Sequence, residues 1–236
     1  METNNKKAES VVKFYVLCAK LKNLIRTGWK VWNVQNERLE SVAEHIYGTQ
    51  MLAISMKSEF NYDVDLYKVI KMLAVHELEE IIIGDITLFQ MDRTQKEQLG
   101  HKAIEKILDG LVDKQELKAL IFEFDDRTTK EAKFAYFCDK MEADLQARIY
   151  DLKDCVDVKK AKNNDLKDTV VNSLLSSGNS WGQMWLKFGQ TKYNYDDNFL
   201  SVSNFAINND IEKLADLEAE EKLKEWTLLM WIKFKQ

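Results

Sequence analysis

Apolar residues recur at helical spacing along most of the chain, and this pattern predicts a series of long helices. The first predicted helix begins at Ser10 and ends near Gly28, because glycine often terminates a helix. A second begins after Ser41, since Ser41 and Glu44 have the spacing of a capping box. Residues 61–63 then predict a turn. The pattern is that of an all-α fold.

The same spacing continues through the middle of the chain. Further helices are predicted over residues 65–83, ending at Gly84, and over 94–108, 114–124 and 128–153. The segment 29–40 has no clean period and carries two tryptophans among polar residues, which predicts an ordered loop. The chain should therefore be helical with only short connections.

The pattern changes after residue 150. A charged, weakly apolar stretch is followed by Ser-Ser-Gly-Asn-Ser-Trp-Gly-Gln at 176–183, which interrupts the helical period, and a strongly patterned segment covers 209–235. We expect one all-α domain over residues 1–236, with a core at about 10–150 and a helical C-terminal extension at about 151–236. Internal repeats and low-complexity tracts are absent from the sequence.

Composition agrees with this prediction and limits the partners. The 236 residues include no proline, where average usage of about 5% would give about 12, so long unbroken helices are expected and Pro-rich folds are excluded. The net charge of -5, from 34 basic and 39 acidic residues, argues against a nucleic-acid partner. A small phosphorylated ligand stays possible, because one or two basic residues can bind it.

Three unclustered cysteines, Cys18, Cys138 and Cys155, predict buried thiols in a reducing, cytoplasmic compartment. The N-terminal residues are polar, and no run of 18 apolar residues occurs. We therefore expect neither secretion nor a membrane partner.

Polar residues inside apolar helices mark the candidate chemistry. His76, Glu77 and Glu80 lie in the middle of the apolar segment 65–83, and His76 and Glu80 would share one face of a continuous helix. Burying these groups without partners would cost several kcal/mol, so a metal or a cationic partner should compensate them. His45 and Asp139 repeat the anomaly in two other helices, and histidine with carboxylate suits divalent metals. The alternative for a single such histidine is a hydrogen-bonded core residue.

Several separated motifs carry a resemblance to a known family. They are Arg-Thr-Gly-Trp at 26–29, Asn-Val-Gln at 33–35, Glu-Ser-Val-Ala-Glu-His at 40–45, His-Glu-Leu-Glu-Glu-x-x-x-Gly-Asp at 76–85 and Glu-Ala-Lys-Phe-x-x-x-x-Asp-Lys-x-Glu at 131–142. In order and spacing they resemble the HD-domain metal-dependent phosphohydrolases, above all the 5′-deoxynucleotidase-like group. The resemblance covers about residues 14–150.

The resemblance implies a helical HD-domain bundle, a possible homodimer, and a function. That function is removal of the 5′-phosphate from (deoxy)ribonucleoside monophosphates by attack of a metal-bound water. One divalent ion, of Co, Mn, Zn or Fe, would be the cofactor. The implied metal ligands are His45, His76, Glu77 and Asp139; the implied catalytic residues are Glu80 and Asp85; the implied substrate-binding residues are Arg26, for the phosphate, and Trp29, for the sugar.

One departure from the family pattern leaves alternatives open. The family doublet is His-Asp, whereas this chain has His76-Glu77. On an unchanged backbone the longer glutamate would overshoot by about a bond length, although another rotamer could bring it back, and ligand distances tolerate only about 0.2 Å. The alternatives are hydrolysis of another nucleotide phosphoester, such as a cyclic or diphosphorylated nucleotide, or a catalytically weakened nucleotide-binding protein.

The remaining polar and apolar residues near these motifs receive ordinary structural interpretations. We expect His101 to be structural and Glu79 to be a solvated or supporting neighbour of the site. Glu142 and Asp144 should lie on a solvated face, and Met51, Met56 and Met72 in the core. The apolar residues from Trp226 to Phe234 should pack against the domain or a dimer mate.

Overall fold

The computed structural model describes residues 2–87, 89–161 and 165–215, and most of the chain in these ranges is helical. Within them the only extended pairing is an isolated bridge between Ile25 and Ser41. The α-helices are α1 (Glu2–Ala19), α2 (Thr27–Val31), α3 (Val42–Phe60), α4 (Leu66–Val75), α5 (Glu80–Ile83), α6 (Arg93–Ile107), α7 (Lys114–Asp126), α8 (Lys130–Leu152), α9 (Thr169–Ser176), α10 (Trp181–Lys192) and α11 (Asp197–Asn208). Short 3-10 turns are η1 (Lys20–Lys22), η2 (Val158–Lys160), η3 (Asp165–Lys167) and η4 (Glu212–Ala215). The predicted all-α fold is confirmed.

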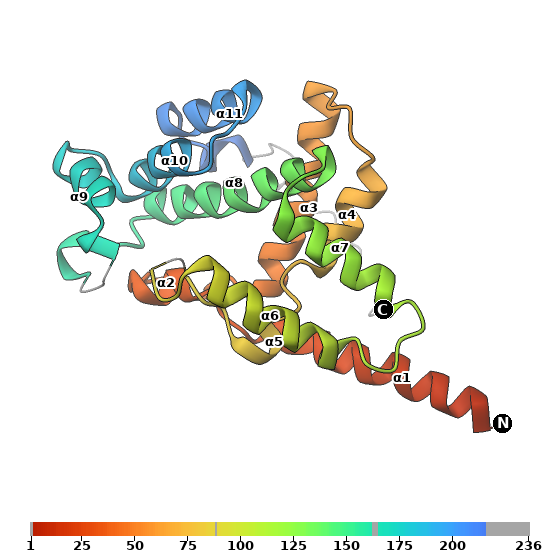
Figure 1. Ribbon diagram of the computed structural model, residues 1–236. Helices are drawn as coiled ribbons and strands as arrows, with labels where there is room; N and C mark the ends of the chain where they lie inside the picture. Colours follow the sequence, from red (N-terminus) through yellow and green to blue (C-terminus); the bar gives the residue numbers. More distant parts are fainter. Residues whose placement is uncertain (1, 88, 162–164, 216–236) are drawn as a thin grey trace, which may run out of the picture.

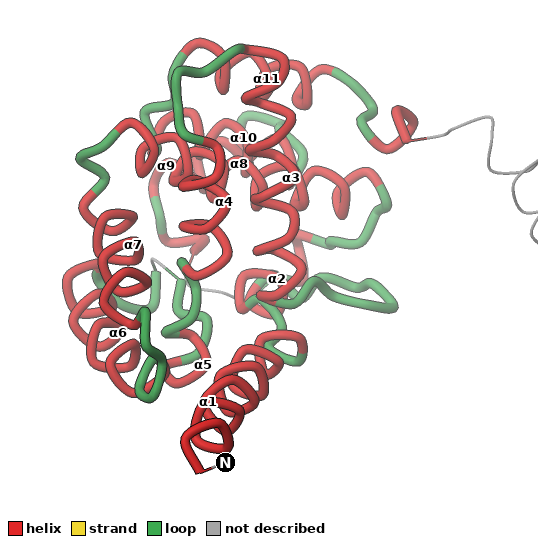
Figure 2. Tube along the Cα trace, turned by 90° about the vertical axis from the view of Figure 1, so that its right-hand side faces the viewer, coloured by secondary structure: helices red, strands yellow, loops and turns green. Residues whose placement is uncertain are grey.

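Helix α8 is the centre of the bundle. It contacts α3, α4 and α7 as well as α10 and α11, and α9 packs in turn on α10. Figure 1 shows α10 and α11 on one side of α8, with α2, α5 and α6 on the other side of the molecule. Helix α1 projects away from this body in both views (Figures 1 and 2). The central helix can therefore present residues to helices from both halves of the chain.

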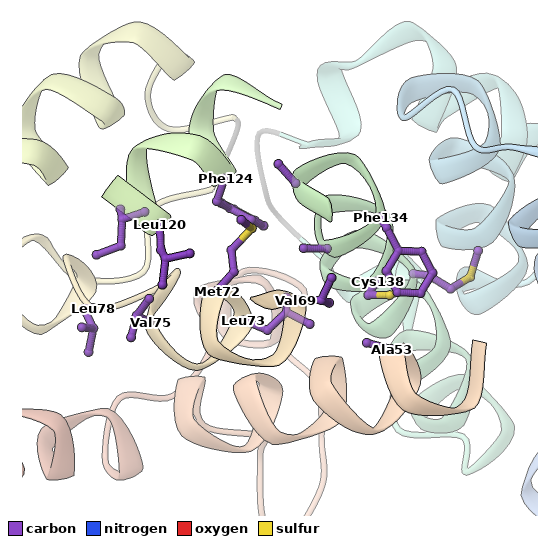
Figure 3. Close-up of a cluster of buried hydrophobic side chains, with 14 of the residues drawn as sticks. Ala53, Val69, Met72, Leu73, Val75, Leu78, Leu120, Phe124, Phe134 and Cys138 are labelled. Carbon is purple, nitrogen blue, oxygen red and sulfur yellow. The ribbon is translucent and has the colours of Figure 1, made fainter. Parts of the chain in front are cut away.

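The main core lies where α4, α7 and α8 meet α3. In Figure 3, Met72 of α4 extends toward Phe124 of α7, while Phe134 and Cys138 of α8 lie to the right, with Leu73 of α4 between the two groups. The same cluster includes the following residues from α10, α11 and the segment between them: Leu186, Tyr195, Phe199, Ala206 and Ile207. The chain after residue 150 thus contributes directly to this core.

A second buried cluster fixes the loop before α3. It includes Trp29 and Trp32 with Tyr150 of α8 and Trp181 of α10. The ring centroids of Trp29 and Tyr150 lie 5.3 Å apart in an edge-on arrangement, which adds to the stabilisation from burial. This packing holds the segment after Arg26 against the centre of the bundle.

Several predicted helix boundaries are confirmed. Ser41 and Glu44 form the expected capping box at the start of α3, and Asn61 ends that helix in the left-handed conformation. Thr129 caps α8 through a bond from the Ala132 N–H. Helices α6, α7 and α8 lie within two residues of the predicted ranges. A second capping box, from Ser180 to Gln183, begins α10 inside the stretch that seemed only to interrupt the pattern.

The first predicted helix is wrong at both ends. Helix α1 covers Glu2–Ala19, and Gly28 lies inside α2 instead of ending the first helix. The reason is a long-range pairing: the Val42 N–H donates to the Leu24 carbonyl at 2.8 Å, and the Arg26 N–H donates to the Glu40 carbonyl at 3.0 Å. These bonds draw the chain out of helical geometry before residue 27. They also place Arg26 beside the start of α3.

The predicted continuous helix 65–83 is also wrong, because it breaks at the polar residues. Helix α4 ends at Val75, residues 76–79 form a turn, and α5 begins at Glu80. The backbone bonds tighten to i→i−3 there, as in the bond from the Glu80 N–H to the Glu77 carbonyl. His76 therefore no longer shares a helical face with Glu80. Gly84 ends α5 as predicted, at a φ of 79° that favours glycine.

Most of the C-terminal pattern lies outside the described residues. Of the segment 209–235 the structure describes only the part up to Ala215, and the stretch from Trp226 to Phe234 is not described. In the part of the chain that is described, no helix combines the length and apolar character needed to cross a membrane.

Candidate functional site

The four predicted metal ligands come together from three elements. His45 lies in the first turn of α3, His76 and Glu77 in the turn after α4, and Asp139 in the middle of α8. All four are buried, and one ligand atom from each lies within 4.8 Å of the others. The turn after α4 thus brings His76 and Glu77 to His45 and Asp139, and the four residues form one buried cluster.

The two imidazoles present the same atom, Nε2, to the same carboxylate oxygens. Nε2 of His45 lies 3.0 Å from Asp139 Oδ1 and 3.8 Å from Glu77 Oε1. Nε2 of His76 lies 3.7 Å and 3.6 Å from these two oxygens. His76 Nε2 is buried without a hydrogen-bond partner, while its Nδ1 lies 2.7 Å from the Leu73 carbonyl oxygen. A buried lone pair aimed at two carboxylates fits a bound cation.

Glu77 reaches the cluster despite its extra methylene. It lies in the turn 76–79, so its backbone does not follow the helix on which an overshoot was expected. Burial opposes ionisation, but Lys96, His76 and Arg26 lower the pKa of Glu77 to about 2. Burial likewise opposes ionisation of Asp139, and Lys140, His45 and His76 hold its pKa well below the usual range. Both carboxylates are therefore ionised, as metal ligands must be.

A cavity of about 590 Å³ adjoins the cluster, and three of the four ligand residues line it: His76, Glu77 and Asp139. Its basic lining residues are Arg26, Arg93, Lys96, Arg127, Lys140 and Lys192. Aromatic walls come from Trp29, Phe124, Tyr136, Trp185 and Tyr193. A concave site with cationic and aromatic walls suits a small anionic ligand that carries a ring.

Arg26 and Asp85 both line this cavity, where the resemblance implied a role for each. Nη1 of Arg26 lies 3.5 Å from Glu77 Oε1 and 3.8 Å from Asp85 Oδ1. Asp85 is itself anchored, because its Oδ2 accepts the Thr27 N–H at 2.5 Å and its carbonyl accepts the Thr27 hydroxyl at 2.6 Å. The Thr27 contribution was missed at the sequence level. The arrangement fixes the guanidinium beside the predicted metal ligands.

Trp29 lines the cavity from a fully packed position. Its side chain is 1% exposed, and its indole N–H donates to Glu40 Oε2 at 2.9 Å. The Glu40 N–H in turn donates to the Tyr150 hydroxyl oxygen at 2.9 Å. Glu40, itself held by Tyr150, thus sets the orientation of the indole from the side away from the cavity.

Glu80 is placed differently from the other predicted residues. It is buried and does not line the cavity; its Oε1 accepts a hydrogen bond from Lys96 Nζ at 3.0 Å. Lys96 does line the cavity. Glu80 therefore reaches this site through a lysine.

Neither residue assigned to a solvated face lies on one, so that expectation is wrong: Glu142 is partly buried, with an 11% exposed side chain, and Asp144 is buried. Glu142 Oε2 lies 2.5 Å from His45 Nδ1, and Asp144, 2% exposed, accepts a hydrogen bond from the Tyr195 hydroxyl at 3.0 Å. Glu142 lies one turn after Asp139 on α8, a spacing from which its position could have been predicted. The sequence around Asp144 gave no such signal, because Tyr195 comes from a distant part of the chain.

The other neighbouring residues divide between the cavity and the core. Glu79 lines the cavity, as does His101, whose Nε2 lies 2.8 Å from Asp125 Oδ2. Met56 and Met72 are buried in the core, as predicted, but Met51 is 40% exposed, so its assignment is wrong. The exposed methionine leaves an apolar patch on α3.

Comparison with known proteins identifies the family of the chain. The family model for the HD domain matches residues 18–193. The chain belongs to the HD domain family. The motifs alone had ended the family region at about residue 150, but the match extends past it and includes the whole of α10.

Named relatives of this HD domain protein include two 5′-deoxynucleotidases HDDC2. The one from Dictyostelium discoideum is 37% identical over 149 residues, which cover 59% of this chain and 77% of the relative. The one from Homo sapiens is 32% identical over 148 residues, covering 61% and 70%.

Solved structures confirm the fold. A Pyrococcus horikoshii OT3 protein superposes with a TM-score of 0.55 at 24% identity, covering 73% of this chain and 99% of that one. A predicted metal-dependent phosphohydrolase from Magnetospirillum magnetotacticum MS-1 gives a TM-score of 0.51 at 24% identity, covering 63% and 76%.

Proposed function

We propose that this HD domain protein is a metal-dependent phosphohydrolase that removes the 5′-phosphate of nucleoside monophosphates, above all of deoxyribonucleoside monophosphates. The observation that carries this proposal is the convergence of two imidazoles and two carboxylates beside a cavity that also contains an anchored arginine. The names of the relatives, 5′-deoxynucleotidases, support the choice of substrate.

His45, His76, Glu77 and Asp139 would hold one divalent ion. When bound, such an ion polarises a phosphoryl oxygen and lowers the pKa of a coordinated water. Mixed imidazole and carboxylate ligation suits Co²⁺, Mn²⁺, Zn²⁺ or Fe²⁺. The availability of each metal in the cell decides which of these ions is bound.

Basic residues of the cavity would bind the phosphate. Arg26 offers a planar fork to phosphate oxygens, and Glu77 and Asp85 hold its guanidinium in place. Lys96 and Lys140 line the same cavity and bring further positive charge close to the ligand cluster. The volume of about 590 Å³ lies in the usual range for small-molecule sites, so a whole nucleotide can enter.

The remaining predicted residues take distinct roles in this proposal. Asp85 faces the cavity and keeps Arg26 oriented; as a carboxylate it can accept a proton from the attacking water and pass it to the leaving 5′-oxygen. Glu80 acts as a positioning residue, because it holds the Lys96 ammonium. Trp29, fixed by Glu40, would contact the sugar and leave no room for a 2′-hydroxyl.

A phosphate-release screen tests the proposal. The purified protein, with Mn²⁺ or Co²⁺ added, should release phosphate from the common 5′-nucleoside monophosphates and faster from deoxyribonucleotides, and a chelator should abolish release. Turnover only of cyclic or diphosphorylated nucleotides would contradict the proposed substrate and favour the first alternative. An absence of release with every metal, at near-zero metal content, would contradict the hydrolase proposal itself.

A variant pair tests the phosphate-binding role. Replacing Arg26 by Ala removes charge-assisted hydrogen bonds of about 1.5–3 kcal/mol, so KM should rise about 10- to 100-fold. Arg38→Ala is the matched control, since the Arg38 side chain is 78% exposed and outside the cavity. An unchanged KM in Arg26→Ala would remove Arg26 from the site.

We also propose that the chain forms a homodimer. The support is an exposed apolar stripe on α3, formed by Tyr47, Met51 and Ile54 at helical spacing. Light scattering of the purified protein should give twice the chain mass of 27.6 kDa, and a monomer mass would contradict this proposal.

A further inference from the structure

Both candidate ligand histidines have a second acceptor behind the ring. His76 Nδ1 lies 2.7 Å from the Leu73 carbonyl oxygen, and His45 Nδ1 lies 2.5 Å from Glu142 Oε2. An imidazole that donates through Nδ1 keeps its lone pair on Nε2, and Nε2 is the atom that each ring directs at the cluster. For His76 the acceptor belongs to the backbone, whereas for His45 it is a side chain.

The structure provides a specific space for the Glu142 carboxylate. Glu142 lies one turn after Asp139 on α8, so the two acids hold opposite ring nitrogens of His45. Across from it, Gly48 lies three residues after His45 on α3. A Cβ added at Gly48 would lie 2.5 Å from Glu142 Oε1 and 3.0 Å from its Cδ and Cγ. Any other residue at position 48 would therefore displace the carboxylate.

A second cation between Glu142 and its neighbours is the competing interpretation. Glu40, His45 and Glu142 also offer ligand atoms that lie within 4.8 Å of one another. Binding there as well would require His45 to use both ring nitrogens as ligands and so to lose both protons. Nδ1 and Glu142 Oε2 lie 2.5 Å apart, closer than in an ordinary hydrogen bond, and this direct contact fits a proton between the two atoms. The contact is therefore better explained as support for the ring.

We propose that Glu142 is the positioning residue for the metal ligand His45, and that Gly48 is the residue that admits the Glu142 carboxylate. The proposal rests on the metal centre proposed above. Acceptors behind a ligand histidine fix its tautomer and ring orientation, and their loss typically weakens metal binding about 10- to 100-fold.

Mn²⁺ affinity, measured by competition with a chelator, tests the pair. Glu142→Ala and Gly48→Ala should each weaken binding about 10- to 100-fold, and the double variant should be no weaker than Glu142→Ala, because both changes remove the same contact. Glu131→Ala is the matched control: Glu131 is a buried glutamate of the same helix that bonds the Asp65 N–H and lies outside the cavity. Its Mn²⁺ affinity should be unchanged.

The thermal midpoint of unfolding distinguishes a residue that positions the metal ligand from one that only stabilises the fold. Gly48→Ala places alanine in a helix interior, where alanine is favoured over glycine, and the clashing Glu142 side chain is flexible. Its thermal midpoint should therefore not fall while its metal affinity does. Additive effects in the double variant, or wild-type affinity in Glu142→Ala, would overturn the proposal.

Nuclear magnetic resonance gives the direct signature. The chain has three histidines, so the imidazole signals of the Zn²⁺-loaded protein can be assigned by substitution. The His45 Nδ1 proton should be visible and slow to exchange in the wild type, and should be lost in Glu142→Ala; a persistent protected proton would contradict the proposal. Wild-type protein that binds neither Mn²⁺ nor Zn²⁺ would refute the metal centre itself, which is a distinct outcome.

Discussion

Metal binding at this site should depend on pH through His45. Burial and the charge of Arg26 oppose protonation of the ring, but Glu142 and Asp139 raise the pKa of His45 to about 9 in the metal-free protein. A metal can bind Nε2 only after that proton leaves. Protons and metal therefore compete below about pH 9.

The sign and the size follow from that pKa. As pH rises from about 7 to about 8.5, the deprotonated fraction of His45 grows about tenfold per unit, so Mn²⁺ affinity should strengthen about tenfold per unit, or about 1.4 kcal/mol. The dependence should flatten as pH approaches about 9. Glu77 and Asp139 contribute little to this slope, because the pKa values of both carboxyls are lowered.

Titration calorimetry in buffers of different ionisation enthalpy measures both the Mn²⁺ affinity and the number of protons released on binding. Near neutral pH, Mn²⁺ binding should release about one proton from the protein. His101→Gln is the control, because that imidazole is outside the ligand cluster and should not alter the slope. An Mn²⁺ affinity that stays constant across this pH range would refute the reasoning that His45 carries a proton which the metal must displace.

Three further predictions test the cluster and the packing around it. Glu77→Asp should weaken Mn²⁺ binding about tenfold, because the shorter carboxylate withdraws from the cluster; tighter binding in a chelator competition would contradict this. Met72→Ala should lower the free energy of unfolding in urea by about 2–5 kcal/mol, whereas Met51→Ala should change it by less than about 0.5 kcal/mol; equal effects would refute the assigned burial. Gly189→Ala should cost about 1–3 kcal/mol in the same assay, because its Cβ would clash with Asp144; wild-type stability would contradict that packing.

The sequence predicted most of the fold because local signals agree with the final structure. The Ser41–Glu44 capping box lies where the pattern placed it, and α8 begins within two residues of its predicted start. The errors arise from long-range interactions: the pairing of Ile25 with Ser41 ends the first helix early, and no local pattern contains it. The turn at 76–79 was hidden because apolar residues continue on both sides of it.

The candidate site was predictable to the extent that its residues interrupt apolar helices. His45 and Asp139 stood out in this way, and the structure brings both into one cluster. Glu142 could have been added from its spacing to Asp139. The burial of Asp144 could not, because it depends on Tyr195, about fifty residues away in the sequence, and on the absence of a side chain at Gly189.

Anomalous diffraction from crystals grown with Mn²⁺ tests the central claim most directly, because it locates the ion without reference to activity. The account predicts a peak bounded by Nε2 of His45 and His76 and by the carboxylates of Glu77 and Asp139. A peak beside Glu142 instead, or no peak within the cluster at a saturating Mn²⁺ concentration, would contradict this account.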